Sequence, residues 1–440
     1  MICSESRIGV IFMQVKKGIR LQIYPNKEQS ILLNKTLGCC RFLYNKMLEE
    51  HVKIYAQLKD DKDALYSHQY KTAKQYKQEF PFLKEVDAKA LQTENRHLFA
   101  AYQHFFEGLK TGRAVGFPKF KSKKQYPQTY TTYNINNSIR IDNQKRKIRI
   151  PKVGWIKYRD NRAITDPIKH ITLSKTATHK YFVAVTVVCE MEIPPKKTVL
   201  NREDIAGFDM SATHFLIGER VQYENPRFYR EEEKRLKKQH RELSRKQEGS
   251  KNWEKSRLKL GWIYEKINNR KRDWLHKTTH DLSERHDAVI LENLNIKGMQ
   301  QFNSGLSKSI TLDFSWYQFR AYLDYKLDWK GKHFVLIDRF FPSSKRCAFC
   351  GQINNDLTLS DRVWTCKHCD TTHHRDKNAV VNIKGEGIRI LKEEIGIVVI
   401  STTDHDTSTV GTTGSHASGE DVRPSTDTGQ FSLKEESTSL

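Results

Sequence analysis

Alternation of apolar and polar residues near the start of the chain predicts a half-buried strand. Apolar side chains at positions 19, 21 and 23 alternate with polar ones, and Pro25-Asn26 ends the run. A helix is expected next, because Asn26 and Gln29 resemble a capping pair and apolar residues then recur at helical spacing as far as Leu48. Further helices are expected up to about Lys110, with one apolar stripe formed by Leu91, Leu98, Tyr102 and Phe105.

Short alternating runs in the following stretch predict antiparallel hairpins. Residues 139–141 oppose residues 148–150 across a polar turn, and residues 171–173 precede a longer run at 181–188. We expect these strands to form a small β-barrel together with the strand at 19–23. The predicted domains are 14–25 for the first barrel strand, 26–111 for an inserted helical domain, and 112–195 for the rest of the barrel.

The second half of the chain combines buried strands with long helices. Residues 205–209 have the composition of a buried strand, and residues 215–218 are its expected hairpin partner. A long helical hairpin is expected between Arg227 and Lys277, with its break at Gly249-Ser250. Two more apolar strands are expected, at 288–291 and 334–337. The predicted fold class is therefore α/β, with several domains.

Four cysteines, Cys347, Cys350, Cys366 and Cys369, have the spacing C-x2-C-x15-C-x2-C. Each two-residue spacer lets a tight turn direct two thiolates at one ion, so the pattern predicts a structural zinc ribbon over 343–372. Gly351 suits the left-handed turn of such a knuckle. Phe349 and Trp364 are expected to cover one face of the site. The alternatives are two disulfides, an iron site with the same ligands, or replacement of one cysteine by His368, His373 or His374.

Three acidic residues occupy positions from which they could form one cluster. Asp209 ends the first buried strand, Glu292 ends the second, and Asp376 precedes a helix-compatible apolar run at 378–383. Carboxylate oxygens suit Mg²⁺ or Mn²⁺, and two such ions about 3.5–4 Å apart can activate water and stabilise the leaving oxygen of a phosphodiester. Each acid also has a structural alternative, which is solvation at a strand end for Asp209 and Glu292 and helix capping for Asp376.

Charge and aromatic content point to nucleic acid as the partner. The 440 residues carry a net charge of +24 and 10% aromatic residues, which together attract phosphates and offer faces for base stacking. Two basic stretches, 112–124 and 227–277, contain the candidate contacts Lys119, Lys121, Lys123, Lys124, Arg235, Lys237, Lys238, Arg241, Arg245, Lys246, Arg270 and Arg272. The alternatives are a solvated loop and solvated helix faces. Binding to anionic lipid is disfavoured, because no segment approaches about 18 apolar residues.

The chain ends and the scattered cysteines predict a cytoplasmic protein. The apolar run at 8–13 is shorter than the roughly 7–15 residues of a secretory signal core, and the recognisable pattern begins only after Met13, which is an alternative start. Cysteines outside the ribbon are isolated, as expected in a reducing compartment. Residues 401–440 are rich in Ser, Thr and Gly, with seven acidic residues against two basic ones, and predict a disordered tail.

With these motifs in place, the sequence resembles the TnpB (OrfB) proteins of insertion sequences, compact RNA-guided nucleases related to type V CRISPR effectors. The resemblance lies in four motifs in a fixed order, which are Gly207–Met210, Leu291–Met299, the Cys347–Cys369 ribbon and Arg375–Ala379, with a similar tail at 410–424. It implies an RNase H-like RuvC domain at 200–342 and 373–400 that is interrupted by the ribbon, and an N-terminal wedge barrel with a helical recognition insert.

The same resemblance implies the chemistry and the partners. Asp209, Glu292 and Asp376 would hold catalytic Mg²⁺, and Zn²⁺ would be structural. A guide RNA from the transposon end would direct cleavage of double-stranded target DNA beside a short motif. The alternative is a non-cleaving DNA- and RNA-binding accessory or regulator of transposition, which the presence of all three acids disfavours. A strand-transferring transposase is disfavoured because we find no His-hydrophobe-His pair with a nucleophilic Tyr.

Overall fold

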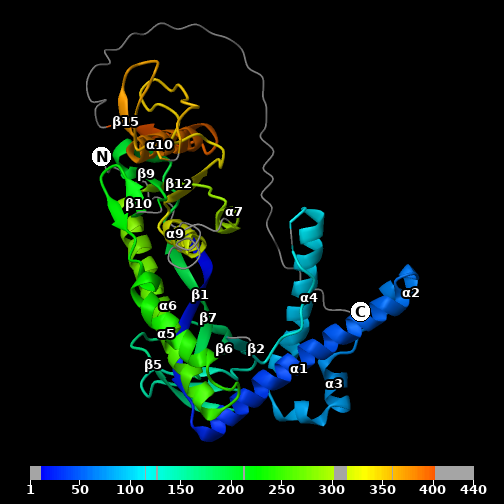
Figure 1. Ribbon diagram of the computed structural model, residues 1–440. Coiled ribbons are helices and arrows are strands. Elements are labelled where there is room, and N and C mark those ends of the chain that lie inside the picture. The colour runs from blue at the N-terminus through cyan, green and yellow to red at the C-terminus, as the bar shows by residue number, and fades with distance from the viewer. Residues whose placement is uncertain are drawn as a thin grey trace, which may run out of the picture. The chain divides into compact units, whose positions relative to one another are not determined.

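The computed structural model describes residues 11–113, 115–124, 127–211, 214–301, 315–358 and 360–401 (Figure 1). These residues divide into two compact units, one formed by the chain up to Asn34 and from Lys123 onward, the other by Lys35–Ser122. The predicted tail at 401–440 lies almost entirely outside the described residues. No helix in the described part of the chain is both long enough and apolar enough to cross a membrane.

Four helices account for the predicted inserted domain. They are α1 (Lys27–Leu58), α2 (Lys62–Ser67), α3 (Ala73–Glu79) and α4 (Ala88–Lys110), with a short 3-10 helix at Pro81–Glu85. The predicted cap of α1 is confirmed: the Gln29 backbone N–H donates to Asn26 Oδ1 (2.8 Å), and the Asn26 N–H donates to Gln29 Oε1 (3.1 Å). Leu91 and Leu98 of the predicted stripe are fully buried.

A seven-stranded antiparallel sheet contains the predicted hairpins. Its strands are β1 (Ile11–Tyr24), β2 (Gln128–Tyr133), β3 (Arg140–Asp142), β4 (Lys147–Ile150), β5 (Gly154–Arg159), β6 (Ile168–Lys175) and β7 (Tyr181–Ile193), in the order β2-β6-β7-β1-β5-β4-β3. Ile141 pairs with Ile148, so that predicted hairpin is confirmed. Pairing among the described strands leaves β2 and β3 as the two edges, so the hydrogen bonds support a sheet rather than the predicted closed barrel.

A second sheet has five strands, two of which end at the predicted site residues Asp209 and Glu292. Its strands are β9 (Ile205–Asp209), β10 (His214–Gly218), β11 (Gln222–Glu224), β12 (Ala288–Glu292) and β13 (His333–Ile337), in the order β11-β10-β9-β12-β13. The predicted β9–β10 hairpin is confirmed by the antiparallel pairing of Asp209 with Ile217. By contrast, β9, β12 and β13 are mutually parallel.

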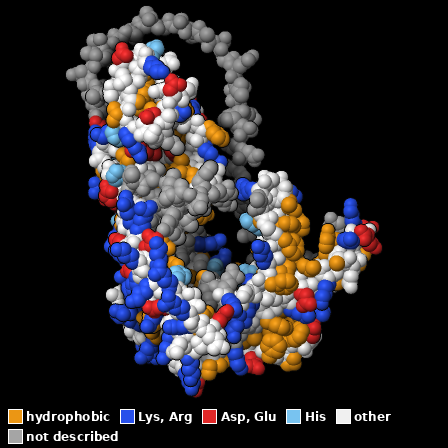
Figure 2. Space-filling view, in the orientation of Figure 1, with side chains coloured by type: hydrophobic (Ala, Val, Ile, Leu, Met, Phe, Trp, Pro, Cys, Tyr) orange, Lys and Arg blue, Asp and Glu red, His pale blue; other side chains and the backbone are white. Residues whose placement is uncertain are grey.

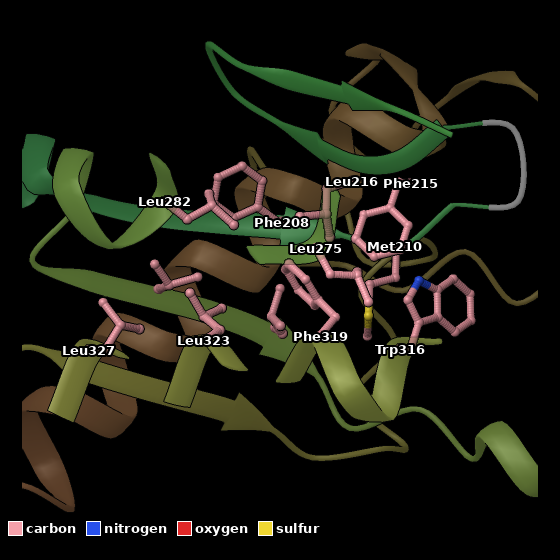
Figure 3. Packing of buried hydrophobic residues seen from close by; sticks show 12 residues of the cluster. Phe208, Met210, Phe215, Leu216, Leu275, Leu282, Trp316, Phe319, Leu323 and Leu327 are labelled. Carbon is pink, nitrogen blue, oxygen red and sulfur yellow. The ribbon is translucent and has the colours of Figure 1, made fainter. Parts of the chain in front are cut away.

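Helices cover both faces of this five-stranded sheet. The hairpin of α5 (Phe228–Ser244) and α6 (Lys251–Arg285) is present as predicted, and α7 (Ile296–Gln301), α9 (Trp316–Asp328) and α10 (Arg375–Glu393) follow. One core packs the sheet against α6 and α9, with Phe208, Phe215 and Phe319 at its centre (Figure 3). The second core packs the opposite face against α10. Alternation along β12 explains the division, because Val289 and Leu291 face the first core and Ala288 and Ile290 the second.

Helix α10 lies unusually close to the sheet. A Cβ atom on Gly207 of β9 would lie 2.7 Å from the backbone nitrogen of Lys384, and one on Gly387 of α10 would lie 2.3 Å from the Ile290 side chain. Glycine at both positions therefore lets the backbones approach. The remaining strands are β8 (Val199–Asn201) paired with β16 (Val398–Ile400), and β14 (Val363–Thr365) paired with β15 (Thr372–His374), with a 3-10 helix at Arg202–Asp204.

Candidate active site and metal centre

The topology places two of the predicted acids at one edge of the sheet. Phe208 of β9 pairs in parallel with Leu291 of β12, so the next residue of each strand, Asp209 and Glu292, lies at the shared carboxyl edge. Asp376 is the second residue of α10, the helix that packs across β9 and β12. The cap of this helix is His374, so the alternative role of Asp376 as the N-cap is wrong.

The three carboxylates interact electrostatically. Burial is the main cause that raises the pKa of Asp209 to about 7, and the negative charges of Glu292 and Asp376 raise it further. Burial also raises the pKa of Glu292. Positive charge offsets this repulsion only in part, through Arg375 beside Asp209 and through Arg362, whose Nη1 lies 3.5 Å from Asp376 Oδ2. Burial of Asp209 and Glu292 disfavours the alternative that they are simply solvated acids at strand ends.

A buried set of hydrogen bonds joins Glu292 and helix α10 to the start of the ribbon. The Ser343 hydroxyl donates to Glu292 Oε1, and the Ser343 carbonyl accepts from Asn382 Nδ2 (2.8 Å). Asn378 and Asn382 also donate to the Arg346 carbonyl (2.7 and 2.6 Å). Ser343, Asn378 and Asn382 are all buried. We call these contacts the Ser343 strap; through them α10 holds the strand end that carries Glu292.

Sequence reasoning missed the Ser343 strap. The available signal was the pair Asn378 and Asn382, two amides one helical turn apart within an otherwise apolar run. Amides at such positions are buried only when they are hydrogen-bonded. Nothing in the sequence indicated which carbonyls would accept from them.

The four predicted cysteines form one cluster. Their sulfur atoms all lie within 4.8 Å of one another, with Cys347 Sγ and Cys369 Sγ 3.7 Å apart and Cys350 Sγ and Cys366 Sγ 3.6 Å apart. All four are free thiols, so the alternative of two disulfides is wrong. Hydrogen bonding with Thr371 lowers the pKa of Cys369 to about 6, while burial and hydrogen bonds with the other cysteines raise the pKa of Cys350 to about 12. Four converging thiols fit a tetrahedral structural zinc.

The surroundings of the cluster correct one expectation. Gly351 has the predicted left-handed backbone (φ 78°), and Trp364 is buried against the cysteines. Phe349 is 78% exposed and lies outside the hydrophobic cluster around the cysteines, so it does not cover the site. Among the three candidate histidines, His373 contacts the cysteine cluster, with its Nε2 3.0 Å from Cys347 Sγ.

The structure separates the predicted basic contacts into paired and unpaired residues. Lys121 lies 2.6 Å from the fully buried Glu94 and over the ring of Tyr44, so it holds the helical unit together. Ion pairs also join Lys124 to Glu248, Arg235 to Glu232, Lys237 to Glu233 and Arg270 to Glu231, while Arg272 donates to Asn269. Within the described parts of the chain, no ion pair involves Lys119, Lys123, Lys238, Arg241, Arg245 or Lys246.

Four of these cations, Lys238, Arg241, Arg245 and Lys246, lie on α5 or directly after it and leave the helical hairpin strongly positive. Lys and Arg side chains gather along α5 and α6 on the face seen in Figure 2. In the other basic stretch, 112–124, Phe117 packs edge-to-face on Tyr102 and Phe105 and so anchors the stretch to α4. Phe120 of the same stretch is 59% exposed. The hairpin is therefore the better candidate for contact with phosphates.

Comparison with known proteins identifies the family. Residues 186–303 match the OrfB family of IS605 elements, described as "Probable transposase", and residues 316–383 match "Cas12f1-like, TNB domain". A Streptomyces pristinaespiralis protein named "Putative RNA-guided DNA endonuclease" is 31% identical over 384 residues, which cover 86% of this chain and 91% of that protein. The chain belongs to the TnpB (OrfB) family. The predicted membership is thus confirmed.

A second curated relative of this TnpB-family chain matches it over a similar length. InsQ of Escherichia coli (strain K12), which has the same descriptive name, is 28% identical over 86% of this chain and 94% of its own length. The solved structure titled "Cryo-EM structure of the Cas12f1-sgRNA-target DNA complex" has a TM-score of 0.42 and 13% identity, covering 84% of this chain and 99% of that chain. Residues 13–60 match "Helix-turn-helix domain", yet here they form β1 and the single helix α1.

Proposed function

We propose that this TnpB-family protein is an RNA-guided DNA endonuclease that hydrolyses phosphodiester bonds at Asp209, Glu292 and Asp376. The observation that carries the proposal is that Asp209 and Glu292 lie at the carboxyl edge of neighbouring parallel strands, where burial, and then the charges of Glu292 and Asp376, raise the pKa of Asp209 to about 7. The choice of RNA as the guide and DNA as the target rests on relatives named as RNA-guided DNA endonucleases, which the chain matches over most of their length.

The donor set of this site fits Mg²⁺. Three carboxylates with only partial neutralisation form a site whose repulsion a divalent cation relieves, and oxygen is the ligand that Mg²⁺ prefers. When bound, Mg²⁺ lowers the pKa of a coordinated water and stabilises charge on the leaving oxygen. The protein would contribute the three ligands, and the Ser343 strap would orient Glu292. The cysteine cluster would hold zinc without an open position for catalysis.

We also propose that the parts of this structure correspond to the domains of the family. The seven-stranded sheet with β1 would be the wedge, and the helices α1 to α4 would be the recognition insert. The five-stranded sheet with α10 would be the RuvC-like nuclease domain, which the ribbon at 343–372 interrupts. The basic hairpin α5–α6 would contact the nucleic acid.

The guide itself is the most direct test of the proposed function. We expect protein purified from cells that express it with its transposon end to retain one discrete RNA, because a protein that reads a heteroduplex by shape needs a structured ligand. Sequencing the copurified RNA and then supplying matched duplex DNA with Mg²⁺ should give cleavage. Heterogeneous cellular RNA would contradict the guided function. A discrete RNA with no cleavage of matched DNA would favour the binding-only accessory.

The Ser343 strap makes a separate prediction about pH. The Ser343 hydroxyl stabilises charged Glu292 and lowers its pKa against the effect of burial, so Ser343→Ala raises the pKa of Glu292. Because cleavage needs the charged carboxylate, the acid limb of the pH–rate profile should move to higher pH. A hydrogen bond to a charged group contributes roughly 1.5–3 kcal/mol, so the acid limb should move by about 1–2 pH units and the rate on that limb should fall about tenfold or more.

Two variants control this experiment. Ser343→Thr keeps the hydroxyl and should restore the profile. Ser344→Ala removes the neighbouring hydroxyl, which makes no hydrogen bond to an acid among the described residues, and should leave the profile unchanged. A Ser343→Ala loss that is equal at every pH would mean that Ser343 only supports the fold.

A further inference from the structure

The groove between the two helices of the basic hairpin has the features of a nucleotide site. Arg235 and Gln239 of α5 face Lys259, Trp262 and Lys266 of α6 across a recess of 530 Å³, with Ile263 as a further lining residue. On α6, positions 259, 262 and 266 lie on one helical face, and 235 and 239 do so on α5. The groove is therefore built by the pairing of α5 with α6, whose buried contact includes Leu236 and Ile263.

Trp262 is the unusual residue of this groove. Its side chain is 53% exposed although Ile263 beside it is almost fully buried. An indole that is half exposed among cations offers a face on which a base can stack, and its exposure costs free energy unless a partner covers it.

The charges around Trp262 favour an anionic occupant. Lys266 and Arg235 share one acid, Glu232, at 2.7 and 3.5 Å, and Lys259 has no ion pair among the described residues. The groove therefore keeps a positive excess on both sides of the indole. Gln239 of α5, whose amide nitrogen donates to Glu242 Oε2 (2.7 Å), adds a neutral polar side chain to the lining.

We propose that the groove between α5 and α6 binds one unpaired nucleotide of a single nucleic-acid strand, with the base stacked on Trp262 and the flanking phosphates held by Lys259, Lys266 and Arg235. Duplex would be excluded, because its bases are already stacked on one another. This inference rests on the proposed function in taking nucleic acid as the partner, and it adds a site away from the three acids.

The test measures binding of fluorescently labelled oligouridylate to the full chain by anisotropy, in Mg²⁺-free buffer at several salt concentrations. Trp262→Ala should weaken binding on the order of tenfold at each salt concentration, with an unchanged salt slope, because stacking releases no counterions. Trp262→Phe should retain most of the affinity. Lys259→Gln should weaken binding and reduce the salt slope by about 0.7, the contribution of one phosphate contact on a single strand.

Controls make each outcome decisive. Trp155→Ala removes a similarly exposed indole (44%) from β5 and should bind as the wild type does, and thermal melts check that every variant folds. Oligothymidylate in place of oligouridylate distinguishes a DNA strand from an RNA strand as the source of the nucleotide. Equal binding by Trp262→Ala and wild type, or equal losses in Trp262→Ala and Trp155→Ala, would overturn the site. Displacement by polyglutamate at matched charge would assign the groove to an acidic peptide instead.

The outcome is separable from that of the proposed function. The wild type could bind oligouridylate through Trp262 and yet retain no discrete RNA and cut no matched DNA. That result would contradict the RNA-guided nuclease function but support the nucleotide site in the groove. A wild type that cuts matched DNA while Trp262→Ala binds and cuts equally well overturns the groove alone.

Discussion

Replacing Asp209 with Asn is expected to reduce cleavage of a guide-matched duplex by about a thousandfold or more, while RNA and DNA binding stay nearly intact. The substitution removes a proposed ligand whose metal stabilises the transition state by several kcal/mol, and each 1.36 kcal/mol corresponds to a tenfold change in rate. Asp209 is not a phosphate-binding cation, so binding has no reason to weaken. Cleavage at saturating protein with Mg²⁺, and binding by filter retention, measure the two effects.

The fold should survive this substitution. Burial and the neighbouring acids raise the pKa of Asp209 to about 7, so its charged form is disfavoured in the folded chain. The stability that the protonated form contributes is fully present below the unfolded pKa of about 4 and is lost as pH rises through about 7. At pH 8 without Mg²⁺, the Asp209→Asn variant should therefore melt no lower than the wild type.

A neighbouring acid provides the matched control. Asp338 follows β13 at the same edge of the sheet, is exposed, and accepts a hydrogen bond from the Phe340 N–H (2.8 Å) that Asn can also accept. Asp338→Asn removes the same charge from the same edge and should cut as the wild type does. Cleavage at the wild-type rate by the Asp209→Asn variant would show that Asp209 is not part of the catalytic site. Equal losses in both variants would mean that general charge, and not a ligand, is responsible.

Replacing Cys366 with Ser should abolish zinc retention and unfold the ribbon. Cys366 is buried in the cluster, and structural zinc contributes roughly 10–16 kcal/mol to folding in zinc-finger peptides. Cleavage should also fail, because the ribbon carries the Arg346 carbonyl to which Asn378 and Asn382 of α10 donate. Elemental analysis should give one zinc per wild-type chain and almost none in the variant. Limited proteolysis should cut within 343–372 in the variant only.

Cys189→Ser is the control for this experiment. Cys189 is buried in β7, and its thiol donates to the Val15 carbonyl (3.5 Å), a bond that Ser can also make. This variant should keep one zinc and full cleavage. A wild type without zinc, or a Cys366→Ser protein that stays protease-resistant and active, would contradict the structural role of the metal.

Local patterns were enough to predict many of the elements and the cysteine cluster. Period-two alternation marked β9 and β12, and the Asn26–Gln29 pair marked the start of α1, because these signals depend on neighbours in sequence. The cysteine spacing predicted its cluster for the same reason, since each knuckle is a local turn. The three acids were identified by their places at the ends of predicted elements.

Tertiary structure decided how those elements meet. The parallel register of β9 and β12 makes Asp209 and Glu292 neighbours, and the packing of α10 through Gly207 and Gly387 adds Asp376 to them. It also decided that Lys121 pairs with buried Glu94 and that Ser343 orients Glu292, since each contact joins residues far apart in the chain. Sequence by itself determined which side chains are available. Which of them are buried together, and hence which charges repel or pair, followed only from packing, because burial sets the free energy of a charge and is a property of the whole fold.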